Sequence, residues 1–288
     1  MQSKLNQKSV LQQFARRLPE LLMPLLTRPE KWLFANGLLP SRKIALPDFL
    51  GIGAPQSGTT WLYENLRSHP EIFMPERKEL RYFEKNFHKS LSLYYAPNFK
   101  PGLNKVKGEI TPSYGKMPLE RIRFIRKIMP QLKLILILRN PVDRVWASTR
   151  RAFAKRPGAL FEEAKEQEIL ACFQDGERRA NTNYLAILDH WLSVFPKEQL
   201  FIAFFEEITN DPQMLLGKVF HFLGVSDRVD WNLFPYAQVI NKNPERPIPE
   251  KLREVLGRSY RDDIEGLYKR FGEPVRLWRI PEDRQNPV

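Results

Sequence analysis

The chain has 288 residues, 42% of them hydrophobic, which is enough for one large α/β domain or two small ones. Its net charge of +13 predicts an anionic partner, such as a nucleotide, an acidic glycan, a nucleic acid or a membrane surface. The single cysteine excludes a disulfide within the chain, and the four histidines show no metal-ligand spacing. No apolar run reaches the roughly 18 residues of a membrane span, and the N-terminus lacks the apolar core of a signal peptide. These features together predict a soluble protein of the reducing cytoplasm.

Residues 1–46 form a basic extension in which apolar residues recur at helical spacing from Leu11 to Leu26. Pro19 and Pro24 interrupt this pattern. We expect a helical extension that packs on the domain, and docking to a membrane surface or a partner is the alternative. The main domain is expected to span residues 47–280, followed by a tail at 281–288.

The stretch from Phe49 to Leu62 predicts a strand, a glycine-bearing turn and a helix. This arrangement aims backbone N–H groups and the positive end of the helix at an anion. The spacing Gly53-x4-Gly58 is that of a P-loop, but Thr59 stands where a triphosphate-binding loop has lysine. The missing lysine argues against hydrolysis of ATP or GTP. This stretch alone leaves open an ordinary strand-to-helix turn.

Two further segments carry polar residues that could serve a site. Residues 75–83 form a charged loop with the adjacent pair Lys78-Glu79, followed by aromatic residues. Such a pair is usually a solvated surface pair, but a loop near a phosphate-binding turn is also where α/β enzymes place catalytic groups. Residues 107–114 predict a short strand running into a turn.

The clearest strand covers residues 132–138, an almost unbroken apolar run typical of a parallel strand covered on both faces. It follows a basic amphipathic helix over residues 118–129 and ends in Arg139. In a P-loop NTPase an aspartate at such a strand end serves Mg²⁺, whereas arginine suits phosphate. Ligands of open parallel sheets bind at the carboxyl ends of strands. The sequence therefore predicts a phosphate site at this edge.

The rest of the chain alternates helices with one more strand. The expected elements are a helix over 144–154, a helix and loop over the cleft within 155–180, a helix from Tyr184 to Phe195, a strand over 200–205, a helix over 211–223, a loop over 241–249 and a helix over 251–271. This alternation predicts a single α/β domain with a mainly parallel central sheet and helices on both faces.

Several motifs in this order resemble those of one family. They are Gly53-Ala54-Pro55-Gln56-Ser57-Gly58-Thr59-Thr60, Lys78-Glu79-x-x-Tyr82-Phe83, Gly108-Glu109-x-Thr111-Pro112-Ser113-Tyr114, Leu138-Arg139-Asn140-Pro141-Val142-Asp143-Arg144, and the run from Tyr184 to Val225. Each motif alone is weak, but their shared order is specific. The chain resembles the sulfotransferases that use 3′-phosphoadenosine 5′-phosphosulfate (PAPS), nearest their heparan-sulfate-like and bacterial branch, over roughly residues 47–280.

The resemblance implies a role for each matching residue. Glu79 would take the proton from a hydroxyl or amine acceptor, and Lys78 or Gln56 would stabilise charge on the bridging oxygen. The residues implied in holding PAPS are Gln56, Ser57, Gly58, Thr59, Thr60, Trp61, Arg139, Ser148, Lys242 and Arg246. No metal is expected, because the transferred group is already activated and needs positioning, one base and cations.

Two positions depart from the family pattern. Gln56 stands where the family often has Lys or Arg, and Ala147 stands where it has a serine eight residues after the strand-end arginine, with Ser148 one residue later. A shifted helix register, or help from Lys242 and Arg246, would restore the contacts. Otherwise the affinity for PAPS would be weak, or the activity changed or lost.

Two other functions stay open at this point. One is a P-loop nucleotide kinase, which the missing loop lysine disfavours. The other is a catalytically impaired member of the fold that binds polyanions or nucleotides, which the charge and the two departures favour. For the enzyme, the acceptor is expected to be a small molecule, a glycan or a carrier-bound intermediate, with no specific nucleic-acid partner.

Overall fold

The computed structural model describes residues 27–154, 166–238, 240 and 247–279. Within them, five parallel strands form one sheet in the order β2-β3-β1-β4-β5. The strands are β1 (Phe49–Gly53), β2 (Ile72–Phe73), β3 (Val106–Ile110), β4 (Lys133–Leu138) and β5 (Leu200–Phe204). The predicted parallel sheet is confirmed, and β1 lies between β3 and β4 in its middle.

Helices follow or connect these strands. The α-helices are α2 (Thr59–Ser68), α3 (Leu119–Ile128), α4 (Pro141–Ala154), α5 (Glu166–Phe173), α6 (Gly176–Ala180), α7 (Tyr184–Leu192), α8 (Phe205–Asn210), α9 (Pro212–Leu223) and α10 (Glu250–Phe271). A π-helix covers η2 (Leu91–Tyr95), and 3-10 segments cover η1 (Ser41–Lys43), η3 (Ala96–Gly102), η4 (Pro112–Lys116), η6 (Lys197–Gln199), η7 (Trp231–Leu233) and η8 (Glu273–Trp278). Residues 27–35 are helical as well.

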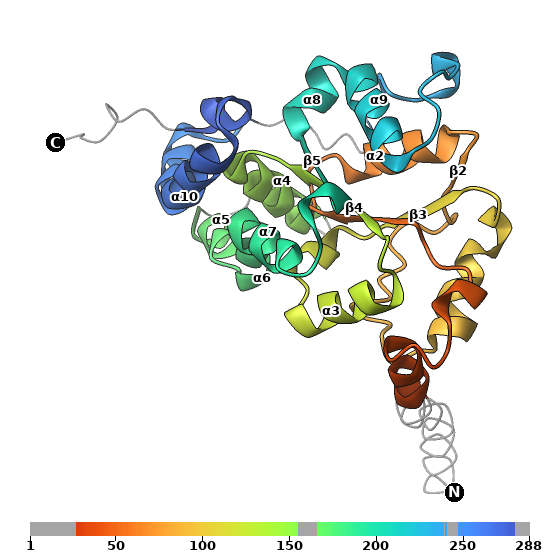
Figure 1. Cartoon of the computed structure of the whole chain (residues 1–288). Helices are drawn as coiled ribbons and strands as arrows, with labels where there is room; N and C mark the ends of the chain where they lie inside the picture. The colour runs from red at the N-terminus through yellow and green to blue at the C-terminus, as the bar shows by residue number, and fades with distance from the viewer. Residues whose placement is uncertain (1–26, 155–165, 239, 241–246, 280–288) are drawn as a thin grey trace, which may run out of the picture.

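Strand β4 divides its side chains between two apolar clusters, one on each face of the sheet. Leu134, Leu136 and Leu138 join the cluster that contains buried residues of α3, α4, α7 and α10. Ile135 and Ile137 join the cluster formed with α2 and α9. Figure 1 shows α2 and α9 on one side of the sheet and α3 and α7 on the other. The alternation of strand side chains therefore explains why the whole run is apolar.

The helix-forming signals of the sequence act as expected in most places. The α3 residues Ile122, Ile125 and Ile128 are buried, as their spacing predicts. Asp211 caps α9 by accepting from the Met214 amide at 3.0 Å. The predicted start of α4 at residue 144 is wrong, because the helix begins at Pro141, where proline suits the first helical turn.

Two other expected elements differ in detail. The strand predicted over 200–205 ends at Phe204, since Phe205 begins the short helix α8. Of the segment predicted as a helix and loop, residues 166–180 hold two short helices, and residues 155–165 lie outside the described residues.

The described part of the N-terminal extension is bonded to residues 88–92. Thr27 donates to the His88 carbonyl at 2.7 Å, and Lys31 donates to the Lys89 carbonyl at 2.9 Å. Glu30 accepts from the amide of Ser92 at 2.9 Å. The predicted boundary at residue 46 stays a prediction, and residues 1–26 and the tail lie outside the described residues.

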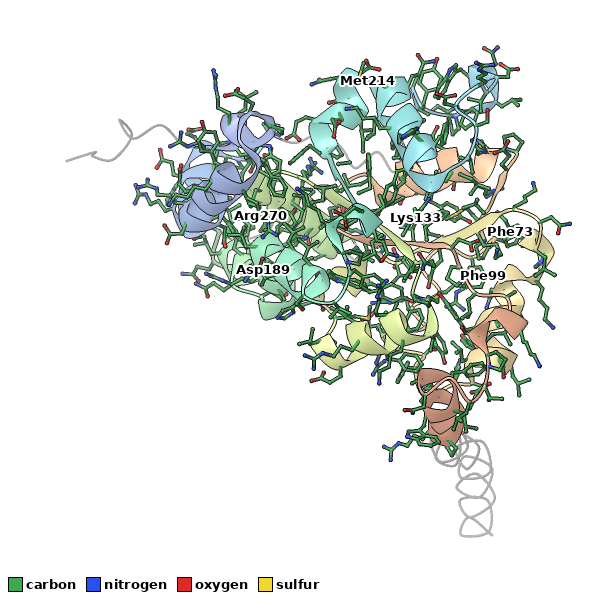
Figure 2. All side chains as sticks on the ribbon, viewed as in Figure 1. Phe73, Phe99, Lys133, Asp189, Met214 and Arg270 are labelled. Carbon is green, nitrogen blue, oxygen red and sulfur yellow. The ribbon has the colours of Figure 1, made fainter. Side chains whose placement is uncertain are left out.

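Helix α10 closes the structure against α7. Asp189 and Arg270, labelled in Figure 2, form an ion pair of 2.7 Å between these helices. Exposed pairs of this kind contribute roughly 0–1 kcal/mol. The buried residues of α10 therefore carry most of the attachment: Leu252, Leu256, Tyr260, Ile264 and Leu267.

Candidate active site

The turn between β1 and α2 leaves the start of a helix open. Gly58 precedes α2 with φ 82°, and no side chain caps the helix. The positive φ favours glycine at this position, and a Cβ there would also have to displace the end of the Ile208 side chain, whose Cδ1 lies 2.3 Å from it. Gln56 also has a positive φ of 66°. The first amides of α2 are therefore available to an anion.

The polar side chains of the turn are buried to different degrees. Ser57 is fully buried, and its Oγ has no hydrogen-bond partner among the described residues, although it lies beside the Tyr184 hydroxyl. Thr59 is buried and Thr60 is half-buried. An unpartnered buried hydroxyl costs free energy. A ligand oxygen at the turn would remove that cost.

Trp61 is turned into the apolar cluster behind the turn. Its indole Nε1 donates to the Tyr236 carbonyl at 2.8 Å. This bond ties α2 to the segment that precedes Lys242 and Arg246. Those two predicted cofactor-binding residues lie outside the described residues.

Arg139, at the end of β4, lies against the same turn. Its Nη1 donates to the Gln56 carbonyl at 2.9 Å, and its guanidinium carbon lies 4.2 Å from the centre of the Phe205 ring. The Tyr184 hydroxyl donates to the Arg139 carbonyl at 3.0 Å. The buried Nε of Arg139 has no hydrogen-bond partner among the described residues. Burial lowers the pKa of Arg139, and nearby Asp143 opposes this shift. Arg139 is thus a partly dehydrated cation with a free donor.

A second arginine, Arg144, lies next to the β1–α2 turn. It is buried, its Nε donates to Thr182 Oγ1 at 2.9 Å, and its Nη2 donates to the Arg178 carbonyl at 2.8 Å. A long bond of 3.5 Å reaches the Pro55 carbonyl. On α4, Ala147 is buried and Ser148 is half-buried. The position that departs from the family pattern therefore faces the interior.

The Lys78-Glu79 pair lies in the loop after β2. Lys78 Nζ lies 3.4 Å from Glu79 Oε1, with 18% of the Lys78 side chain and 40% of the Glu79 side chain exposed. Burial lowers the pKa of Lys78, and Glu79 opposes this shift. A half-exposed carboxylate beside a desolvated cation is accessible to a substrate.

Glu109, the other carboxylate considered from the sequence, has a different environment. It is 2% exposed and accepts hydrogen bonds from Tyr95, Thr111 and Tyr114. Such a buried and fully bonded group cannot reach an acceptor in solvent.

The strand order brings these groups to one edge of the sheet. The Thr111 amide, just past β3, donates to the Gly51 carbonyl of β1 at 3.0 Å, and the Arg81 amide donates to Thr111 Oγ1 at 3.3 Å. Thr111, the β1–α2 turn and Arg139 thus follow the neighbouring strands β3, β1 and β4, and loop 78–84 is bonded to Thr111.

Sequence reasoning missed three contributors to this edge. They are Tyr184, Phe205 and the pair Arg81–Glu84, in which Nε and Oε2 are 3.0 Å apart. The sequence predicts Tyr184 as the start of a helix, and its position in the first turn of α7, next to the polar Asn183, is the signal that could have marked it. Within the described ranges no group of three or more His, Cys, Asp or Glu could hold a metal ion. No helix in that part of the chain is long and apolar enough to cross a bilayer.

Known proteins similar to this chain agree on one family. The family described as "Sulfotransferase domain" matches residues 46–242. Human heparan sulfate glucosamine 3-O-sulfotransferase 6 is 29% identical over 194 residues, covering 65% of this chain and 54% of that protein. The chain thus spans about half the length of this relative.

Solved structures agree with the sequence relatives. The crystal structure of a sulfotransferase from Alicyclobacillus acidocaldarius has a TM-score of 0.64 and 25% identity, covering 82% of this chain and all of that one. Mouse sulfotransferase SULT7A1 complexed with PAP (3′-phosphoadenosine 5′-phosphate) shares the fold, with a TM-score of 0.50 and 18% identity over 83% of this chain and 90% of that one. With the family match spanning more than half of its length, the chain belongs to the sulfotransferase family.

Proposed function

We propose that the protein transfers a sulfuryl group from PAPS to a hydroxyl or amine acceptor. The observation that carries this proposal is the uncapped start of α2 behind a turn whose buried Ser57 hydroxyl is unpartnered within the described residues. Membership of the sulfotransferase family supports it. Thr59 in place of the P-loop lysine favours a phosphosulfate over a triphosphate.

The residues at the sheet edge fit PAPS in charge and in hydrogen bonding. Ser57 Oγ and Arg139 Nε are buried atoms without partners in the described part of the chain, and PAPS offers anionic oxygens to both. We propose that the α2 amides with Gln56, Ser57, Gly58, Thr59 and Thr60 hold its 5′-phosphosulfate. Arg139 and Ser148, with Lys242 and Arg246, would hold its 3′-phosphate, while Trp61 anchors α2. The PAP bound by the mouse enzyme of the same fold supports this choice of ligand.

The chain supplies a base and a cation beside this site. Bound PAPS contributes an activated sulfuryl group whose leaving group is a phosphate. Glu79 is the proposed base, because it is a half-exposed carboxylate on a loop at the same edge. It accepts the proton of the acceptor hydroxyl as oxygen attacks sulfur. Lys78, or the amide of Gln56, stabilises the charge that develops on the bridging oxygen.

The proposed acceptor is a small molecule, a glycan or a carrier-bound intermediate. The glycan option is supported by the relative whose name gives heparan sulfate glucosamine as its acceptor. The single cysteine is the basis for proposing a cytoplasmic location.

A panel assay with ³⁵S-labelled PAPS tests this function. The acceptors are an N-sulfated heparan oligosaccharide, a neutral oligosaccharide, a long-chain alcohol and a β-hydroxyacyl carrier protein. We expect label on at least one of them, and thermal stabilisation by PAP that exceeds stabilisation by ATP with Mg²⁺. A ligand at 100 times its Kd adds about 2.7 kcal/mol of stability. Greater stabilisation by ATP with Mg²⁺ would favour a kinase, and salt-sensitive polyanion binding without transfer would favour a non-catalytic binder.

A further inference from the structure

The loop that carries the proposed base has an unusual backbone. Glu79 has φ 63° and Arg81 has φ 53°, and neither residue is glycine. Residues held in this region cost on the order of 1–3 kcal/mol each and persist where the surroundings determine them. Something next to this loop must therefore hold it.

Two backbone amides of the loop lead to one buried carboxylate, that of Glu109, through a hydroxyl group each. The Arg81 amide donates to Thr111 Oγ1 at 3.3 Å, and that hydroxyl donates to Glu109 Oε2 at 2.9 Å. The Phe83 amide donates to the Tyr114 hydroxyl at 3.3 Å, which donates to Glu109 Oε1 at 2.9 Å.

The hydrogens in this cluster have one consistent arrangement. Thr111 and Tyr114 each accept from an amide and so direct their own proton to Glu109, while Tyr95 donates to it at 2.7 Å. A carboxylate has about four lone-pair positions for these donors. Burial raises the pKa of Glu109, and the hydrogen bonds oppose this shift. Burial also raises the pKa values of Tyr95 and Tyr114, so both phenols keep the proton that they donate.

We infer that Glu109 is a positioning residue that, through Thr111 and Tyr114, holds loop 79–83 in the conformation that presents Glu79. Glu109 itself touches no substrate, because it is buried beneath the loop. The role of Glu79 in this inference rests on the proposed function, whereas the conformation of the loop does not.

A pair of Thr111 variants tests the inference with little change in volume. Thr111→Val removes the relay hydroxyl, and Thr111→Ser restores it. Thr149→Val is the matched control, since Thr149 is fully buried and its hydroxyl has no hydrogen-bond partner among the described residues. Glu109→Gln would break the centre of the cluster but can also fail to fold, so the threonine pair carries the test.

The first readout is amide hydrogen exchange of residues 80–83 in the ligand-free protein. We expect faster exchange in Thr111→Val and exchange close to wild type in Thr111→Ser and Thr149→Val. The second readout is steady-state kinetics with the acceptor labelled best in the panel. A displaced catalytic group can cost roughly 100-fold. We therefore expect kcat of Thr111→Val to fall about 10- to 100-fold, with PAP affinity within about 2-fold of wild type.

The outcomes separate this inference from the proposed function. Equal exchange in the valine and serine variants would overturn the relay. Faster exchange with unchanged kcat would overturn the positioning role. A wild-type protein that neither binds PAP nor transfers sulfate would refute the function, and the exchange result would still decide whether Glu109 holds the loop.

Discussion

Arg139 Nη1 donates a hydrogen bond of 2.9 Å to the main-chain oxygen of Gln56, which joins the end of β4 to the turn after β1. One arginine is therefore bonded to the turn proposed for the 5′-phosphosulfate while its Nε stays available to a further acceptor. Arg139 therefore combines its observed support of the turn with the proposed contact to the 3′-phosphate, and these two roles are separable.

The two roles of Arg139 predict different ligand dependence. AMP lacks the 3′-phosphate of PAP, so a direct contact makes Arg139→Ala lose affinity for PAP but little for AMP. A lost charge-assisted hydrogen bond costs about 1.5–3 kcal/mol, or roughly 10- to 100-fold in Kd. Calorimetry with both nucleotides measures this difference. Lys127→Ala, an exposed cation before the amino end of β4, is the control. Equal losses for PAP and AMP would leave Arg139 with the supporting role alone.

Gln56→Lys tests whether the missing loop cation is a deficit. The residue already has φ 66°, so the exchange of one long side chain for another adds no new backbone strain. We expect an unchanged fold, with tighter PAP binding or a higher kcat, because a cation at this turn attracts the phosphosulfate. Gln56→Met, which removes the polar amide without adding charge, is the control. Unchanged or lower affinity and kcat would indicate that Lys78 already supplies the charge.

Parts of this site could be predicted from the sequence because they follow from local pattern. The apolar run of β4 and the isoleucine spacing of α3 determine their elements, and both were predicted. Residues at the carboxyl ends of parallel strands were expected to meet, and the structure brings Arg139 to the turn. These features can be predicted because hydrophobic periodicity and the ends of strands depend on residues that are close in the chain.

The missed features depend on partners far away in the chain. Arg144 bonds to Thr182, 38 residues later, and Trp61 bonds to Tyr236, 175 residues later. The left-handed backbone at Glu79 and Arg81 has no local signal either, because neither residue is glycine or asparagine. Tertiary contacts determine such positions, so sequence pattern alone does not reveal them.

Lys31 predicts a pH dependence of stability. Burial lowers its pKa from 10.5 to about 8, with Glu30 opposing the shift and Arg121 adding to it. Between these pH values the unfolded chain binds the proton and the folded chain does not, so this group makes stability rise with pH. Below pH 8 both states are protonated, and the burial of the charge lowers stability.

A comparison with Lys31→Met isolates this effect. The free energy of unfolding of the wild type, minus that of Lys31→Met, should rise from about pH 8 to about pH 10.5 and be flat below that range. Urea titrations at several pH values measure the difference, in which the contributions of tyrosines and of net charge largely cancel. Exposed Lys43→Met is the control. A difference that stays constant across this range would contradict a lowered pKa for Lys31.

Glu79→Gln tests the proposed base. Glutamine keeps the size and hydrogen-bonding capacity of the side chain but cannot take the proton from the hydroxyl of the acceptor substrate. General-base catalysis typically raises the rate 10²–10⁴-fold. We expect kcat to fall by about that factor, with PAP affinity and Tm close to those of wild type, since other residues hold the nucleotide. Glu76→Gln, an exposed carboxylate three residues earlier, is the control and should keep its turnover.

If Glu79→Gln retained most of its kcat, the half-exposed carboxylate beside Lys78 would not be the base. Because Glu109 is buried and bonded, the alternative base would then be Glu84, whose carboxylate is bonded to Arg81 and Ser113 at the same edge.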